Sequence, residues 1–107
     1  NENVATDVEE FHSDEAKLVK IKDINLSMVS EPVKVFGIVE KVSFRSLNRP
    51  RLDLRDNTGA IAVIMFTPLP EDIGVGDEVK VIGIVMRKYL LRGQSAVAGM
   101  SMAKINV

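Results

Sequence analysis

Two seven-residue stretches of this chain are nearly identical, and both alternate between apolar and other positions. Val33–Val39 reads VKVFGIV and Val79–Val85 reads VKVIGIV, each with a glycine near its centre. Alternation with period two is typical of a half-buried β-strand, and a glycine inside a strand marks a bulge or a tight bend. Two bent strands of this kind predict a small, strongly coiled barrel of five strands.

The segment between the two copies contributes a hairpin. Arg51–Asp56 alternates strictly as RLDLRD, and Asn57-Thr58-Gly59 follows as a tight turn in which Gly59 is expected to take a positive φ. The complete pattern predicts five strands at about Val33–Phe44, Arg51–Asp56, Ala60–Phe66, Glu78–Arg87 and Gln94–Ile105. Strands without a long helix indicate an all-β domain.

The rest of the chain divides into connectors and a leader. Residues 67–77 hold two prolines and two glycines and predict a connector with at most one helical turn. Leu18–Ile24 is apolar and basic, and is expected to pack under the barrel as a short strand or turn. Residues 1–16 predict a flexible acidic leader, in which Val4, Val8 and Phe11 have helical spacing. The barrel domain is therefore expected to span residues 17–107.

Charge is unevenly placed along the chain. The whole chain has a net charge of −1, but residues 1–16 carry six acids and no Lys or Arg, which leaves residues 17–107 with fourteen basic against nine acidic side chains. With no cysteine, there is no disulfide framework, thiolate metal site or thiol nucleophile. The single histidine, His12, lies in the leader, and no glycine-rich phosphate loop occurs. We therefore expect no enzymatic activity, no metal and no cofactor.

The chain also lacks targeting signals. No apolar run approaches the roughly 18 residues of a membrane span, and the acidic start does not resemble a signal peptide. These features predict an intracellular protein, in the cytoplasm or the nucleus or nucleoid. The absence of an initiator Met indicates a piece of a longer protein.

Val33–Ile105 resembles the oligonucleotide/oligosaccharide-binding fold (OB-fold), a five-stranded Greek-key barrel, of the nucleic-acid-binding superfamily. Leu52–Ile61, LDLRDNTGAI, is similar to a pattern shared by replication protein A, archaeal single-stranded-DNA-binding proteins and anticodon domains of class II aminoacyl-tRNA synthetases. Gly76–Gly83 resembles the Gly-Asp opening of strand four in these families. Val19–Ile24 resembles the segment that precedes the barrel in the archaeal replication-protein-A group. The anticodon domains usually place a polar residue after the hairpin glycine, whereas this chain has Ala60–Val63, AIAV.

The resemblance implies a groove for single-stranded nucleic acid across strands two and three. In these families the groove is bounded by the loops that join strands one and two and strands four and five. Single strands are held there by cations along the backbone and by aromatic rings on which bases stack. The candidate residues at these places are Arg45, Arg49, Arg51, Arg55, Arg87, Lys88, Tyr89, Arg92, Phe44 and Phe66.

Each aromatic candidate has a structural alternative. Tyr89, flanked by cations, is expected either to stack on a base or to close the mouth of the barrel. Phe44 and Phe66 can stack on bases or fill the core, and simple alternation places Phe44 on the same face as Phe36, which is predicted to be core. A bulge at Gly37 would shift that phase.

The charged and sulfur-containing side chains also have two readings. Arg51 and Arg55 share the polar face of strand two, where they contact phosphates or are both neutralised by Asp53. The methionines of the last three strands are expected to fill the core or, if exposed on one side, to form a protein interface. They are Met65, Met86, Met100 and Met102.

Two classes of function follow. The first is largely sequence-independent binding of single-stranded DNA by a module of a replication- or repair-type protein. The second is a scaffolding OB-fold that binds a protein subunit of a single-strand-binding complex, which the low aromatic count of five favours. RNA or tRNA binding would use the same groove and stays open.

Overall fold

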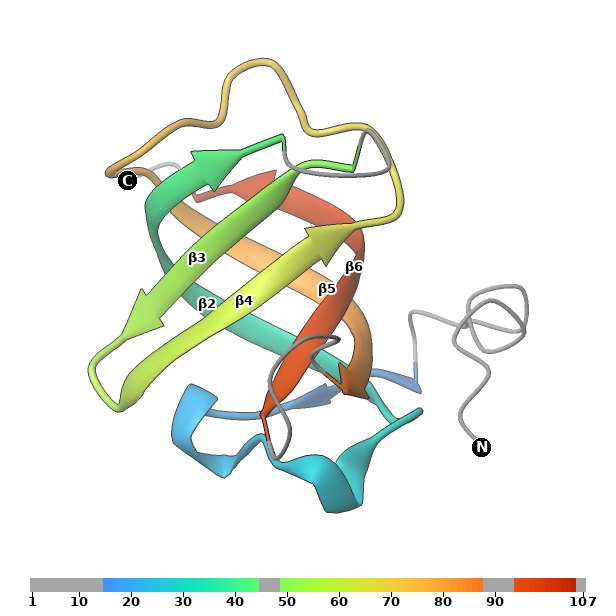
Figure 1. Ribbon diagram of the computed structural model, residues 1–107. Helices are drawn as coiled ribbons and strands as arrows, with labels where there is room; N and C mark the ends of the chain where they lie inside the picture. Colours follow the sequence, from blue (N-terminus) through green and yellow to red (C-terminus); the bar gives the residue numbers. More distant parts are fainter. Residues whose placement is uncertain (1–14, 45–48, 88–93, 106–107) are drawn as a thin grey trace.

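The computed structural model describes residues 15–44, 49–87 and 94–105, which form a closed β-barrel (Figure 1). Its five long strands are β2 (Pro32–Ser43), β3 (Arg51–Asp56), β4 (Gly59–Met65), β5 (Glu78–Arg87) and β6 (Ser95–Lys104). A two-residue strand, β1 (Lys17–Leu18), and two 3-10 turns, η2 (Ile21–Asp23) and η3 (Leu26–Met28), precede them. The five predicted strands are confirmed, with each boundary shifted by at most one residue.

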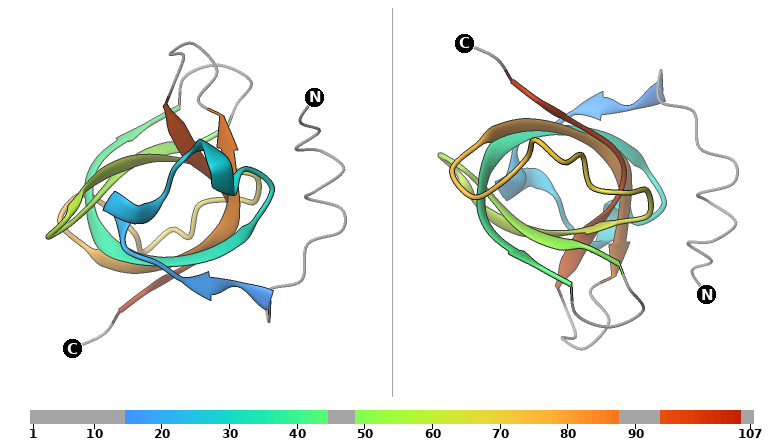
Figure 2. Two further views of the ribbon diagram at one scale, coloured as in Figure 1. Left: turned by 90° about the horizontal axis from the view of Figure 1, so that it is seen from below. Right: turned by 90° about the horizontal axis from the view of Figure 1, so that it is seen from above.

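The sheet closes on itself in the strand order of an OB-fold. Antiparallel pairs join β2 to β3, β3 to β4, β5 to β6 and β2 to β5, and the parallel pair of β4 with β6 completes the ring. Views along the barrel show this ring directly (Figure 2). Each of the five long strands is therefore paired with two other long strands, and β1 pairs with the start of β2.

The glycines of the two repeated segments lie where strands come closest. β2 pairs with β5 up to Ile38 and with β3 from Ile38 onward, so Gly37 sits at the change of partner. A Cβ atom at Gly37 would lie 2.8 Å from the carbonyl oxygen of Arg55. Gly83 lies at a register shift between β5 and β6, where a Cβ atom would lie 2.2 Å from the carbonyl oxygen of Ala98. The prediction of a bulge or bend is therefore confirmed at Gly83, whereas Gly37 allows the close approach of β2 to β3 without a register shift of its own.

Both ends of the barrel are plugged by connecting segments. At one end, the segment with η2 and η3 crosses the opening and buries Ile21 and Ile24 (Figure 2). At the other end, the connector between β4 and β5 buries Ile73 and packs Leu69 against the core. This connector contains turns and no helix, in agreement with the sequence.

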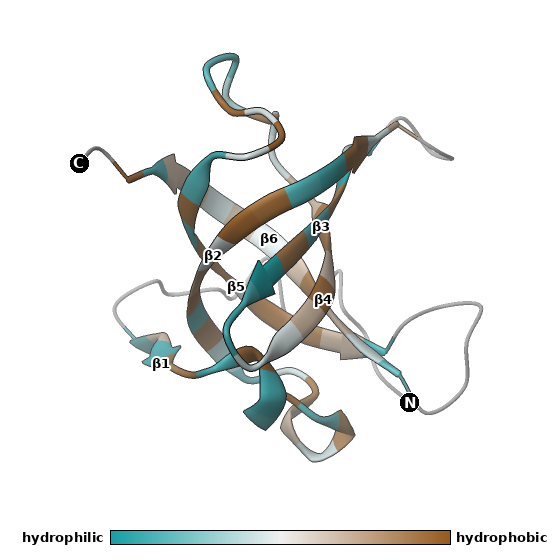
Figure 3. Cartoon of the chain, turned by 90° about the vertical axis from the view of Figure 1, so that its left-hand side faces the viewer, coloured by the Kyte–Doolittle hydropathy of each residue, from teal (hydrophilic) through white to brown (hydrophobic). Residues whose placement is uncertain are grey.

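The orientation of β2 differs from the prediction for Phe36. Figure 3 shows hydrophobic and hydrophilic residues alternating along β2 and β3, but the valines of β2 point inward and Phe36 points outward, 39% exposed. A bulge between Val39 and Lys41 then shifts the alternation and packs Val42 against the core. The expected phase shift exists, but it comes after Gly37.

The turn between β3 and β4 also differs from expectation. Gly59 does not take a positive φ, and the turn is instead held by the Asp56 carboxylate. Its Oδ1 accepts hydrogen bonds from the backbone N–H groups of Thr58 and Gly59, at 2.7 and 3.0 Å. Its Oδ2 accepts one from the Ile21 N–H at 2.9 Å, which ties η2 to the hairpin. Because the Asp56 carboxylate accepts hydrogen bonds from the backbone of the turn, the turn does not require a glycine with a positive φ.

Candidate nucleic-acid interface

The outer side of β2 and β3 presents a polar stripe. Cross-strand pairing places Lys41 beside Asp53 and Ser43 beside Arg51, and Arg55 follows on the same side of β3. These five side chains are half-buried or exposed. Lys41 and Ser43 were not singled out in the sequence; with the valines of β2 inside, the bulge after Val39 turns both to this side.

The neighbouring outer side of β4 and β6 is apolar and made of small residues. Arg51 lies beside Ile64, which pairs with Ala98, and Asp53 lies beside Ala62, which pairs with Ala96. Apart from Ile64, these residues on β4 and β6 are alanines that are buried despite facing away from the core. The accessible part of this face is therefore charged along β2 and β3, and along β4 it consists of the apolar residues Ala60 and Ile64.

Two exposed ion pairs hold the arginines of β3. The Nη2 atom of Arg51 lies 3.4 Å from Oδ1 of Asp53, and Nε of Arg55 lies 2.8 Å from Oε2 of Glu40. The prediction that Asp53 neutralises both arginines is therefore wrong for Arg55, because the bulge in β2 brings Glu40 next to it. Exposed pairs of this kind contribute about 0–1 kcal/mol, so a phosphate group can compete for either arginine.

Phe66 and Arg49 form a stacked pair at one end of this face. Phe66 follows β4 on the same side as Ile64, and the Arg49 guanidinium lies 4.1 Å from the centre of its ring. Phe66 is half-buried, so part of its ring is accessible. An exposed cation–π contact contributes about 0.5–1 kcal/mol, less than the roughly 1–3 kcal/mol of a base stacked on an aromatic ring. A base can therefore displace Arg49.

Phe44 lies beside the same pair. It is 68% exposed, so of its two predicted roles the core is excluded. Phe44, Arg49 and Phe66 line one open groove with a volume of about 850 Å³. The groove is completed by residues of the β4–β5 connector that the sequence did not single out: Pro68, Leu69, Pro70 and Val75.

The other residues predicted to bind nucleic acid do not line this groove. Arg45, Lys88, Tyr89 and Arg92 lie outside the described residues. Arg87 is exposed at the end of β5, opposite Ser95, the residue before Ala96 on the apolar face. The structure thus brings Phe44, Arg49 and Phe66 together at one groove. Arg51 lies two residues after Arg49 in the chain. Arg55 and Arg87 lie toward the other end of the barrel.

The core interpretation is confirmed for two of the four methionines. Met65 and Met102 belong to the core, whereas Met86 and Met100 are half-buried outside it. Within residues 15–44, 49–87 and 94–105, no cluster of acidic or histidine side chains could hold a metal ion. The same residues contain no helix long and apolar enough to cross a membrane.

Comparison with known proteins identifies the fold. No family model and no curated protein matches the chain. Asparaginyl-tRNA synthetase from Pyrococcus horikoshii superposes with a TM-score of 0.71 and 21% identity over 83% of this chain. A replication protein A heterotrimer bound to ssDNA gives 0.60 with 17% identity over 71%, and the telomere capping protein Ten1 from Saccharomyces pombe gives 0.61 with 20% identity over 83%.

These similarities establish the OB-fold that the sequence predicts. The chain spans 22% of the synthetase, 58% of the replication protein A chain and 80% of Ten1. It therefore corresponds to one barrel within the first two, larger proteins. Because proteins with many different functions share this fold, the function depends on the side chains of the outer face of β2, β3 and β4.

Proposed function

We propose that this barrel binds single-stranded DNA across the outer face of β2, β3 and β4, largely independently of sequence. The observation that carries the proposal is the accessible Phe66 ring under Arg49, at the end of a face lined by further cations. Around this face and its groove, five cations stand against three carboxylates. They are Lys41, Arg49, Arg51, Arg55 and Arg87 against Glu40, Asp53 and Glu71.

The two halves of the face have separate roles in this proposal. Lys41, Arg51 and Arg55 contact phosphates, and the arginines exchange their exposed carboxylate partners for phosphate oxygens. One base stacks on Phe66, and Arg49 moves from the ring to a phosphate. Sequence independence follows because Ala60 and Ile64, the accessible side chains on the β4 side of the face, offer no hydrogen-bond donor or acceptor to a base edge.

The preference for DNA has its own support. Discrimination of RNA requires polar groups that reach a 2′-hydroxyl, and the β4 side of the face has the apolar residues Ala60 and Ile64 at its exposed and half-buried positions. The solved replication protein A structure among the structural neighbours is bound to ssDNA. A module of a replication- or repair-type protein is the setting that fits this activity best.

Fluorescence anisotropy of a labelled oligo-dT tests the proposal. Binding should be saturable, stronger for single strands than for duplex DNA or matched RNA, and weaker with salt. Three or four phosphate contacts predict a slope of about −2 to −3 in a plot of log K against log salt concentration. A flat titration even at low salt would reject the proposal.

Phe66→Ala should weaken oligo-dT binding by about tenfold, because a stacked base contributes roughly 1–3 kcal/mol. The matched control is Phe36→Ala, which removes a partly exposed ring from the part of β2 that pairs with β5 rather than with β3. Anisotropy titrations of both variants, with circular dichroism to verify folding, provide the measurement. Equal affinities for the two variants would show that Phe66 is not a stacking platform.

A protein-binding scaffold is the second candidate, favoured by the exposed apolar side chains of the barrel. Leu18, Phe36, Ile38, Phe44 and Val75 are all more than one-third exposed. OBody AM3L09, which superposes on this chain with a TM-score of 0.64, was solved bound to hen egg-white lysozyme. A stable complex seen by light scattering, without oligonucleotide affinity, would favour this role.

A further inference from the structure

A small polar pocket opens between β2 and β3 on their outer side. It has a volume of about 80 Å³ and is lined by four side chains, Lys41, Ser43, Arg51 and Asp53. Pairing of the two strands places Ser43 beside Arg51 and Lys41 beside Asp53. Neighbours on one strand that share a face lie about 7 Å apart, and partners across the pair lie about 5 Å apart. The two cations, Lys41 and Arg51, therefore stand at opposite corners of the pocket.

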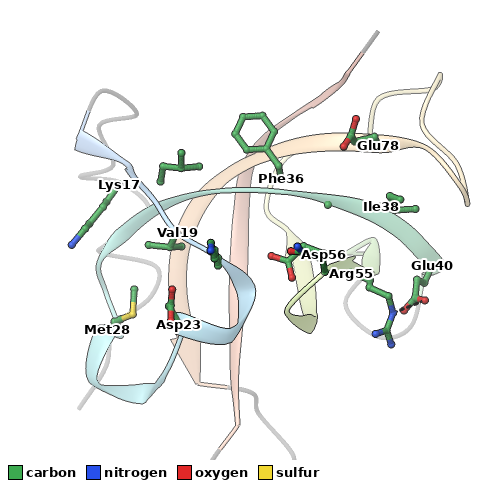
Figure 4. Close-up of a pocket in the computed structure, with 14 residues that line it drawn as sticks. Lys17, Val19, Asp23, Met28, Phe36, Ile38, Glu40, Arg55, Asp56 and Glu78 are labelled. Atoms are coloured by element: carbon green, nitrogen blue, oxygen red, sulfur yellow. Dashed lines mark ion pairs between the residues drawn. The ribbon is translucent and has the colours of Figure 1, made fainter. Parts of the chain in front are cut away.

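The charge of this pocket favours an anion. Two cations against one carboxylate give its lining a net charge of +1. The next charged side chains in the two strands neutralise each other, because Glu40 of β2 and Arg55 of β3 form an ion pair at 2.8 Å. Figure 4 shows this pair, which borders a separate groove along the outer side of β2. An anion between Lys41 and Arg51 is therefore complementary to the pocket.

The hydrogen-bond donors of the pocket are available to a ligand. Within the described part of the chain, the Lys41 ammonium and the Ser43 hydroxyl have no hydrogen-bond or ion-pair partner. Arg51 uses one Nη2 atom for its contact with Oδ1 of Asp53 at 3.4 Å, and a guanidinium has five N–H donors. The oxygens of an ionised phosphate accept hydrogen bonds from all three kinds of group. A phosphate in this pocket therefore meets donors at three of the four corners.

We propose that this pocket binds one phosphate group, with Lys41 and Arg51 on opposite sides of it and the Ser43 hydroxyl as a third donor. Asp53 opposes the binding, because its carboxylate repels the anion and competes for Arg51. The inference deepens the proposed function and rests on it for the source of the phosphate, which is one phosphodiester of the bound strand. A free phosphate ion presents the same kind of oxygens, so the pocket can be tested without DNA.

Titration of the chain with inorganic phosphate, followed by NMR, tests the pocket itself. Sodium chloride keeps the ionic strength constant, so that changes in screening do not contribute. We expect the amide signals of Lys41, Ser43 and Arg51 to shift along one saturable curve with a Kd in the millimolar range. The signals of Lys34 and Lys80, two cations outside the pocket, should not follow this curve. Shifts without saturation, or shifts of equal size at Lys34, would overturn the proposal.

Variants of the lining should change phosphate affinity with opposite signs. Ser43→Ala, which leaves every charge in place, should weaken binding about fivefold through the lost hydrogen bond. Asp53→Asn should strengthen binding about fivefold, because it removes a negative charge about 4 Å from the anion. The matched control is Glu31→Gln, which removes one negative charge from an exposed residue before β2 and should leave the affinity unchanged. Weaker binding by Asp53→Asn, or an equal gain in Glu31→Gln, would overturn the proposal.

The same variants in oligo-dT titrations identify the source of the phosphate. If a strand phosphate occupies the pocket, Ser43→Ala weakens and Asp53→Asn strengthens oligo-dT binding, and inorganic phosphate competes with the oligonucleotide. Unchanged oligo-dT affinity in Ser43→Ala would reject the strand as the source and assign the pocket to a free phosphate ion. Oligo-dT binding without phosphate binding would overturn this inference and leave the proposed function standing. Phosphate binding without oligo-dT affinity would reject the proposed function and keep the pocket.

Discussion

Gly83→Ala should destabilise the barrel by about 3 kcal/mol or more, a large part of the roughly 5–15 kcal/mol that holds a domain of this size. The added Cβ would lie 2.2 Å from the carbonyl oxygen of Ala98 and 2.9 Å from Cγ1 of Val97, both on β6. A backbone oxygen cannot move away as a flexible side chain can. Relief therefore requires β5 and β6 to separate at the register shift beside Gly83. Urea denaturation followed by circular dichroism measures the loss.

Two other glycines provide the controls for this experiment. A Cβ at Gly74 meets nothing within 4 Å, so Gly74→Ala should change stability by no more than about 0.5 kcal/mol. Gly76 is equally open but has a φ of 94°, so Gly76→Ala should cost about 1–2 kcal/mol through backbone strain alone. If Gly83→Ala unfolds at the same urea concentration as Gly74→Ala, the close packing of β5 on β6 is not what makes glycine necessary.

The fold could be predicted because its two strongest signals are local. Period-two alternation marks each strand, and a glycine such as Gly37 or Gly83 is conspicuous inside an apolar run. Alternation does not reveal which face is buried when both faces are apolar, as in the VKVFGIV stretch. The valines of β2 fill the core and Phe36 faces outward, which depends on how β2 crosses β3 and β5.

The candidate site was less predictable because it depends on contacts between strands and loops. The arginines of β3 were visible in the sequence, but the pairing of Arg55 with Glu40 depends on the bulge after Val39. The contact of Arg49 with Phe66 joins two segments that are separated by a whole hairpin. Residue types therefore indicated which side chains could bind, and the register decided which of them meet.

Asp56 links the hairpin to the segment that plugs the barrel, and its ionised form is the one that the fold requires. Burial raises the pKa of Asp56, but hydrogen bonds from the Ile21 N–H, from the hydroxyl and N–H of Thr58, and from the Gly59 N–H more than offset it. Its pKa therefore lies below the ordinary value of 3.8. All four donors favour the carboxylate over the protonated acid.

Replacing Asp56 should therefore lower stability and flatten its acid dependence. Asp56→Ala leaves three backbone N–H groups without their partner and should cost about 2 kcal/mol. Asp56→Asn keeps an acceptor for the turn but turns an NH2 group toward Ile21, and should cost about 1 kcal/mol. Urea denaturation at neutral pH, with the exposed pair variant Asp53→Asn as control, measures both losses.

The pH dependence provides the sharper test of this link. Because the folded-state pKa is depressed, the unfolded chain binds the proton first, and the stabilisation by Asp56 is complete above the unfolded value. It is lost as pH falls through the lower folded value. Urea denaturation between roughly pH 5 and pH 2 should show a smaller loss of stability for Asp56→Asn than for the unaltered chain, since the variant has no carboxyl to protonate there. Parallel curves for the two proteins would mean that Asp56 does not couple protonation to folding, and that the plug segment is held by the burial of Ile21 and Ile24 and by the hydrogen bond from the Lys22 N–H to Thr58.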